Sequence, residues 1–235
     1  MRDSTPKTIW ARGETDDTDK QQAIHTRGLM ILTTASLLLW SVIALAQQQE
    51  PIGQIVALQG QATVQHAGST QVVPLSSQNP VYREDIIQTL EASKIKLVLL
   101  DGTELSLGER GTMTLSKFVY APQQKIHQGV VSIASGFFRA VARKVLPQTF
   151  FEMRTGTAVA AVRGTQWLSE VTPEATGIVV LQGEVAVVHT HRGIRGKVVL
   201  TPGLGTDVRG NHPPTAPKKW AEERVSRLLH ATELP

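Results

Sequence analysis

The sequence predicts an all-β domain built from many short strands, and three observations support this fold class. Short runs of alternating apolar and polar residues recur from Ile52 onward, each bounded by Gly, Pro, Asn or Asp. Helical periodicity is hard to find over the same region. Asp101-Gly102 lies between two alternating runs, which is a strong hairpin signal. The predicted strands lie at residues 54–58, 61–66, 71–75, 85–89, 94–99, 104–107, 112–118, 125–133, 137–145, 149–154, 165–171, 178–181, 185–189, 197–201 and 205–208.

Two segments of the chain repeat one local pattern. Residues 57–66 and 180–189 share the sequence L-Q-G-x-[AV]-x-V-x-H, which reads as a strand, a Gly turn and an alternating strand. Two copies are too few for a repeat array, but they indicate similar stacked turns. We therefore expect a β-solenoid or β-roll-like stack, with an open barrel or sandwich as the alternative.

The N-terminal part indicates export. Residues 1–27 are polar and mixed in charge, so we expect a disordered cytoplasmic n-region. Residues 28–46 form an uncharged apolar run that follows Arg27, and no Lys or Arg comes after it until Arg83, which places the rest of the chain outside the cytoplasm. The A-x-A site at residues 44–46 favours a signal peptide cleaved after Ala46; an uncleaved membrane anchor is the alternative.

The C-terminal part predicts one short helix after a linker. Residues 211–217 are rich in proline, and Pro217 suits a helix start. Residues 218–232 read as the helix, with an apolar stripe of Ala221, Val225, Leu228 and Leu229. A helix this short must dock on something to persist. It either covers the open end of the β-stack or binds a partner.

Composition excludes several functions. The chain has 41% hydrophobic and 19% charged residues, a net charge of +4 and no cysteine. The absence of cysteine excludes disulfides, thiolate catalysis and Cys-based zinc sites, and it suits an oxidising compartment. The basic residues are scattered rather than arranged in a stripe, so we expect no binding to nucleic acid.

A polar corner stands out at Val162, Arg163, Gly164 and Thr165. Arg163 follows Ala-Ala-Val, a segment apolar enough to be buried, so its guanidinium must find carbonyl or carboxylate partners. Gly164 allows a positive φ, and Thr165 restarts a strand. We interpret these residues as a structural corner; an anion-binding arginine in a shallow groove is the alternative.

A second candidate is a surface for contact with a partner. On a strand, Phe137, Arg139 and Arg143 share one face, and Lys144 follows directly. This mixture of aromatic and basic side chains suits an acidic protein or an anionic glycan. A solvated face without a partner is the alternative.

Few residues indicate chemistry. His189 and His191 lie two apart and could ligate a metal from one strand face, but no third ligand is near in sequence, and His127 reads as an isolated surface residue. Asp101 and Glu104, with Glu109, are the one carboxylate group that glycan cleavage could use. Asp101 belongs to the turn, however, and Glu104 faces outward if its apolar neighbours face inward. No nucleophile, phosphate-loop or metalloprotease motif occurs, so we expect no enzyme, no cofactor and no bound metal.

Four motifs in order resemble the FecR domain, the periplasmic sensing domain of iron-uptake regulators. Residues 153–167 resemble its V-x-T-x-x-A-V-x-x-V-R-G-T-x-F signature, with Met153 at the first Val and Trp167 at the aromatic position. Residues 97–107 resemble L-x-L-x-D-G-T-x-L-x-L, and residues 180–185 resemble V-x-x-G-x-V. With the start at residues 52–60, the resemblance covers a FecR-like β domain at 52–210 and favours the solenoid-like form.

The resemblance implies an inner-membrane anti-sigma regulator whose periplasmic domain contacts the signalling domain of an outer-membrane transporter. This sequence differs, because only about 27 polar residues precede its apolar run, too few for a cytoplasmic helical domain that binds a sigma factor. We therefore expect a stand-alone, exported, non-catalytic module that binds an envelope protein or glycan. The alternatives are a membrane-anchored regulator working with a separate cytoplasmic subunit, and an envelope glycan-binding protein.

Overall fold

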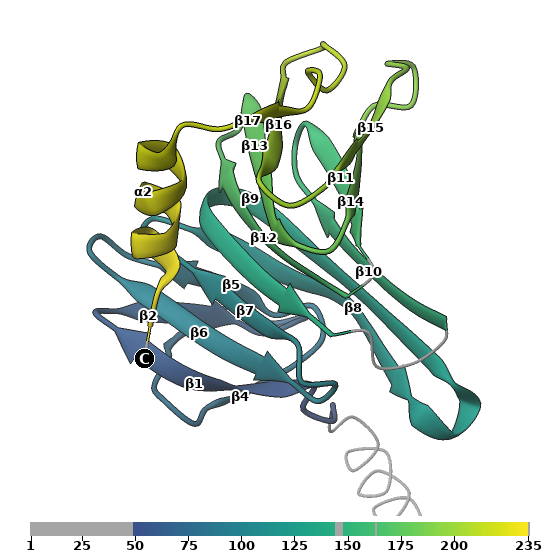
Figure 1. The fold of residues 1–235 in the computed structure, drawn as a ribbon. Helices are drawn as coiled ribbons and strands as arrows, with labels where there is room; N and C mark the ends of the chain where they lie inside the picture. The colour runs from purple at the N-terminus through teal and green to yellow at the C-terminus, as the bar shows by residue number, and fades with distance from the viewer. Residues whose placement is uncertain (1–48, 144–147, 163, 235) are drawn as a thin grey trace, which may run out of the picture. The chain divides into compact units, whose positions relative to one another are not determined.

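The strands are divided between two sheets that share one strand (Figure 1). The computed structural model describes residues 49–143, 148–162 and 164–234. Sheet A contains β1 (Gly53–Gln59), β4 (Pro80–Val81), β6 (Lys94–Leu99), β7 (Glu104–Leu107), β12 (Thr165–Val171), β13 (Ala175–Gln182), β16 (Leu204–Arg209) and β17 (Lys218–Lys219). Sheet B contains β2 (Ala62–Gln65), β3 (Val72–Pro74), β5 (Ile86–Thr89), β8 (Thr112–Ala121), β10 (Gln148–Arg154), β11 (Ala158–Val162), β14 (Val185–His189) and β15 (Lys197–Leu200).

The shared strand is β9 (Ile126–Ala142), which is 17 residues long. Its first part pairs with β8 and β10 in sheet B, and its last part pairs with β7 and β12 in sheet A. The strand bends at Gly136, whose φ is +105°. A Cβ there would lie 2.6 Å from the Cα of Gly111, so a larger residue does not fit. The sequence predicted two separate strands here, and the structure joins them into one bent strand.

The core lies between the two sheets. Alternate residues of both sheets point inward, as period-two patterning requires, and form one apolar cluster. Trp167 of sheet A is fully buried, and its ring centroid lies 6.0 Å from that of Phe151 of sheet B and 6.2 Å from that of Phe138. These edge-to-face contacts connect β9, β10 and β12 at the centre of the domain.

The repeated L-Q-G pattern marks equivalent corners of the fold. At Gly60 the chain leaves β1 of sheet A and enters β2 of sheet B, and at Gly183 it leaves β13 of sheet A and enters β14 of sheet B. Their φ angles are +75° and +83°, a region that favours glycine. A Cβ at Gly183 would lie 2.7 Å from the carbonyl oxygen of Gly164. The pattern therefore encodes a sharp passage from one sheet to the other.

The predicted all-β class and the C-terminal helix are confirmed. The described pairings do not establish a solenoid: neighbouring strands run antiparallel, β9–β10 being the exception, and the two sheets stay open. They pack face to face as in a sandwich, the alternative that the sequence left open. The expected signal or anchor helix at 28–46 lies outside the described residues. In the part of the chain that is described, no helix is both long and apolar enough to cross a bilayer.

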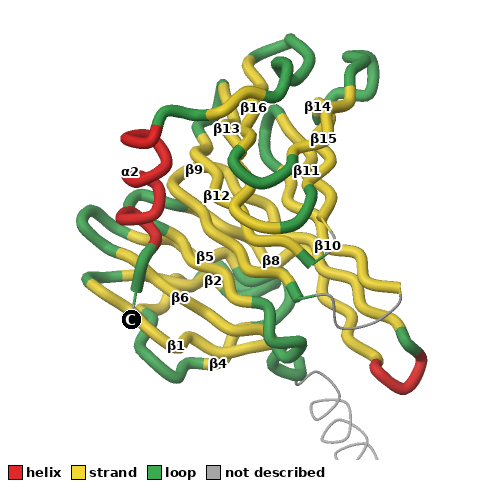
Figure 2. The backbone as a smooth tube through the Cα atoms, in the orientation of Figure 1, coloured by secondary structure: helices red, strands yellow, loops and turns green. Residues whose placement is uncertain are grey.

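Helix α2 (Glu222–Thr232) lies on the outer face of sheet A rather than over an end of the domain (Figure 2). Leu228 is fully buried against Leu168 and Val179 of the sheet. The helix begins later than predicted, because Lys218–Lys219 pair with β16 as strand β17. Trp220, just before the helix, lies over Gly205, where a Cβ would come within 2.5 Å of the indole.

Polar contacts fix the orientation of α2. The Arg224 guanidinium stacks on the Trp220 ring at 3.5 Å and contacts Asp207 Oδ1 at 2.8 Å. Arg227 contacts Glu170 Oε1 at 3.1 Å. Partly exposed pairs of this kind contribute at most about 1 kcal/mol each, so most of the docking energy comes from Trp220 and the apolar contacts.

We expect Trp220→Ala to release α2 from sheet A. Truncating a buried Trp costs about 3–5 kcal/mol of unfolding free energy, and the loss here also removes the stacking partner of Arg224. Hydrogen exchange should show faster exchange for the amides of α2, with a lower melting temperature. Lys218→Ala, two residues away on an exposed position, is the matched control. Unchanged protection of α2 in the Trp220 variant would contradict this account.

Candidate interaction surfaces and buried polar sites

The predicted corner joins the two sheets. Val162 ends β11 in sheet B, and Thr165 begins β12 in sheet A. Gly164 between them has a φ of +68°, and Thr165 Oγ1 donates a hydrogen bond to the Glu184 carbonyl at 3.0 Å. Arg163 lies outside the described residues, so its partners stay a prediction.

The predicted contact surface lies on the outer side of sheet A. Phe137 and Arg139 both project there from β9, but Phe137 packs against the apolar cluster under α2 and is therefore partly covered. Arg143 is exposed beyond the strand end, near Gly102. Lys144 lies outside the described residues. The structure thus brings Phe137 together with α2 and leaves Arg143 apart from it.

A buried acid–imidazole pair lies at one end of the sheets. Asp101, in the turn between β6 and β7, has its Oδ2 atom 2.6 Å from His127 Nε2 of β9, and both side chains are fully buried. The two atoms are in close polar contact, although the ring N–H is not aligned for a linear hydrogen bond. Thr103 donates to Asp101 from its backbone N–H at 3.0 Å and from its hydroxyl at 2.6 Å.

The sequence interpretation of His127 as a surface residue was wrong. His127, Gly129 and Val131 are every second residue of β9, and all three point inward. The ring centroids of Phe118 and Tyr120 lie 6.1 and 5.9 Å from that of His127. The signal that could have found it is this alternation, which places residue 127 on the same strand face as the apolar residue 131.

The environment of Asp101 lowers its pKa below the usual value. Burial raises this pKa, but the contact with His127 and the two hydrogen bonds from Thr103 lower it by more. Asp101 therefore stays ionised inside the protein. Its charge links the β6–β7 turn to β9, so the site connects two segments distant in sequence.

His189 is a structural link in the described residues rather than a metal ligand. Its Nδ1 accepts a hydrogen bond from the His191 N–H at 2.9 Å, so its Nε2 donates to the Gly210 carbonyl at 2.7 Å. Both ring nitrogens are thereby occupied. Across the described ranges, no cluster of three His, Asp or Glu side chains could hold a metal ion.

The three carboxylates considered for glycan cleavage have different partners. Asp101 is buried with His127, Glu104 lies on the outer side of sheet A at 3.6 Å from Lys96, and Glu109 accepts from the Ala92 N–H at 3.0 Å. Leu105 and Leu107 are fully buried, which confirms that Glu104 faces outward. The described geometry does not pair these carboxylates at one site.

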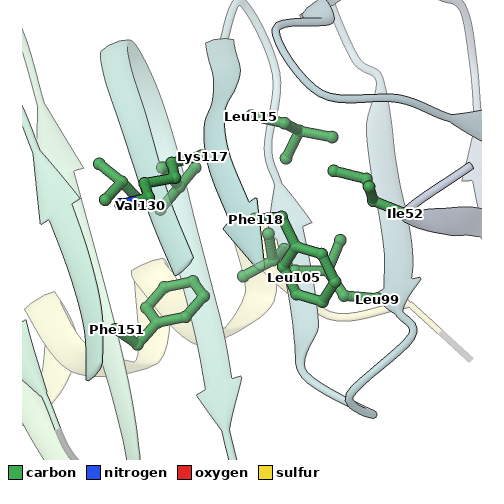
Figure 3. Close-up of a pocket in the computed structure, with 9 residues that line it drawn as sticks. Ile52, Leu99, Leu105, Leu115, Lys117, Phe118, Val130 and Phe151 are labelled. Atoms are coloured by element: carbon green, nitrogen blue, oxygen red, sulfur yellow. The ribbon is translucent and has the colours of Figure 1, made fainter. Parts of the chain in front are cut away.

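A small apolar pocket opens where β8 bulges away from β9 (Figure 3). The register of β8 shifts between Thr114 and Lys117. The pocket has room for about one water molecule. It is too small for a metabolite, which needs several hundred Å³. Its lining residues are Ile52, Leu99, Leu105, Leu115, Lys117, Phe118, Val130, Val131 and Phe151.

Comparisons with known proteins confirm the resemblance seen in the motifs. Residues 85–186 match the family model described as FecR protein. The match covers the β6–β7 hairpin with Asp101, strand β9 and the corner at Gly164. A search of the curated proteins finds no match.

Two crystal structures of a candidate anti-sigma factor from Parabacteroides distasonis ATCC 8503 share this fold. Their TM-scores are 0.51 and 0.50, at 17% and 18% sequence identity. Each covers 61% of this chain, and the chain spans 64% and 63% of theirs. At this identity the likeness establishes the fold alone.

We expect Asp101→Asn to destabilise the protein and to flatten its response to acid. A carboxyl with a lowered folded pKa contributes stability above its unfolded pKa of about 4, and this contribution is lost as the pH falls toward the folded value. Replacing the carboxylate leaves the buried polar groups around it less well satisfied, which costs about 1–3 kcal/mol. Urea unfolding between pH 3 and pH 7 measures both effects.

Glu104→Gln is the matched control, since Glu104 belongs to the same hairpin and forms only a partly exposed contact with Lys96. We expect it to change the unfolding free energy by less than about 1 kcal/mol. If Asp101→Asn unfolds at the wild-type urea concentration at pH 7 and keeps the acid response, the buried pair does not stabilise the fold.

Proposed function

We propose that this chain is an exported, non-catalytic sensing or binding module of envelope signalling. The FecR domain at residues 85–186 is the observation that carries this proposal. Domains of this family take part in signalling through envelope and sigma-factor partners, and the solved structures with this fold are described as candidate anti-sigma factors. The partner of this chain is expected to be an envelope protein or glycan.

The geometry of the described residues supports binding rather than chemistry. The described pocket holds about one water molecule, and the buried Asp101–His127 pair is closed off by aromatic rings rather than open to a substrate. Recognition would then use the outer faces of the sheets. An outer face offers a broad, preformed surface whose backbone moves little on binding, which suits a protein partner.

The apolar run at 28–46 supports export in two forms. Cleavage after Ala46 would release a periplasmic protein that begins at Gln47. The alternative is retention as an inner-membrane anchor with the β domain outside, in a regulator that works with a separate cytoplasmic subunit. The fold shared with a candidate anti-sigma factor keeps this second form as the alternative.

N-terminal sequencing of the protein isolated from fractionated cells tests export. We expect a soluble periplasmic species that starts at Gln47, because signal peptidase cleaves after small residues such as Ala44 and Ala46. Ala46→Lys should block cleavage and retain the chain in the inner membrane, whereas Gln48→Lys, on the far side of the site, should be processed.

Two other outcomes decide between the forms. A wild-type chain that starts at Met1, sediments with the inner membrane and is open to protease from the periplasm would establish the anchored form. A full-length chain that stays in the cytoplasm would contradict both forms and, with them, the proposed role in the envelope.

A further inference from the structure

The outer face of sheet B carries an apolar surface that no described segment covers. Between β11 and β14, Val159 lies opposite Val188 and Ala161 lies opposite Ala186. Between β14 and β15, Ala186 lies opposite Val199. These side chains point away from the core, since they alternate with buried residues of β11 and β14. We call this surface the sheet B face: Val159, Ala161, Ala186, Val188 and Val199, with Val130 of β9 on the far side of Glu152.

The outer face of sheet A shows how this chain covers an apolar surface. There Leu168 and Val179 are neighbours on β12 and β13, and α2 buries both. The described contacts of α2 are with strands of sheet A, namely β6, β9, β12, β13 and β16, so it leaves sheet B uncovered. Figure 1 shows β11, β14 and β15 away from the helix. Val199 accordingly remains 47% exposed.

Positive charge lies at both sides of the sheet B face. Lys117 on β8 pairs in register with Val130 at one side, and Lys197 on β15 pairs with Val188 at the other; both are exposed. Neither has an ion-pair partner among the described residues. Within the face, Glu152 and Arg154 form an ion pair, so their charges cancel.

More positive charge continues beyond Lys197. The loop between β14 and β15 exposes Arg192 and Arg195. Gly196 in this loop lies close to Pro213, since a Cβ there would come within 2.8 Å of the proline ring, and His189 at the end of β14 donates to the Gly210 carbonyl at 2.7 Å. The cations therefore occupy a defined position next to the apolar surface, and they complement carboxylates.

We propose that the sheet B face docks an amphipathic helix of a partner protein, with carboxylates flanking its apolar side. The dimensions agree: strands lie about 4.8 Å apart, so Lys117 on β8 and Lys197 on β15, five strand spacings away, are separated by about 24 Å, the length of a helix of about 16 residues that lies across the strands. This inference rests on the binding role proposed above and names the partner class. The charge pattern is opposite to that of sheet A, where Glu170 and Asp207 contact arginines of α2.

Two other occupants fit less well. In a second copy, α2 already buries its apolar side on sheet A, and two sheet B faces in contact would bring lysines together. A bilayer surface favours protruding aromatic and large apolar side chains, whereas this face consists of Val and Ala on a flat sheet, with only Phe150 protruding nearby. The face is built for a packed protein contact.

Two synthetic peptides test the inference. Both are helical 16-residue peptides with the same Ala/Leu apolar side, one flanked by Glu and the other by Lys. Fluorescence anisotropy with the protein isolated from the envelope should show the Glu peptide binding at least tenfold more tightly. Lys117→Glu combined with Lys197→Glu should reverse this preference.

Substitutions on the face provide the structural control. Ala186→Glu should weaken binding of the Glu peptide at least tenfold, while Thr63→Glu, on the same outer side of sheet B but on β2, should leave it unchanged. If circular dichroism shows that Ala186→Glu does not fold, Val188→Thr replaces it, because threonine keeps the shape of the valine side chain. Val188→Thr should weaken binding of the Glu peptide about threefold.

Three results would overturn the inference. The first is equal affinity for both peptides, and the second is no binding of the Glu peptide at millimolar concentration. The third is a protein that binds phosphatidylglycerol vesicles but neither peptide, and that loses vesicle binding in the Ala186→Glu variant. None of them bears on where the protein is located, so a failure here leaves the export experiment to decide the proposed function by itself.

Discussion

One strand holds the two layers of this protein together. β9 pairs in sheet B over its first part and in sheet A over its last part, so the sheets cannot separate without breaking its backbone hydrogen bonds. This arrangement depends on Gly136, which bends the strand at a φ of +105° and lies against the backbone of Gly111. Trp167 packs against Phe138 and Phe151 in the core between the sheets.

The two outer faces follow from the two layers. Each sheet has one inner side in the core and one outer side with its own pattern of apolar and charged residues. Helix α2 covers the outer side of sheet A. Trp220 fits there because Gly205, beneath the indole, has no side chain. Sheet B keeps its outer side uncovered by any described segment. This asymmetry gives the domain one side used for its own stability and one available for a partner.

Polar groups inside the domain connect segments rather than form an open site. Asp101 and His127 link a turn of sheet A to the start of β9, and His189 links β14 to the loop after β16. Buried ionised groups are costly unless paired, so such contacts restrict how neighbouring segments can be arranged. Their role fits a domain that presents a rigid surface.

Local patterns in the sequence determined the fold class and the presence of a C-terminal helix. Alternation over short runs predicted the strands, and the L-Q-G pattern marked corners that need glycine at Gly60 and Gly183. The tertiary structure decided what pairs with what. That β9 is one strand, that His127 is buried against Asp101, and that Phe137 lies under α2 all depend on residues far apart in sequence. Periodicity within a run shows which side chains share a face, but the covering of that face depends on long-range packing, which a local pattern does not contain.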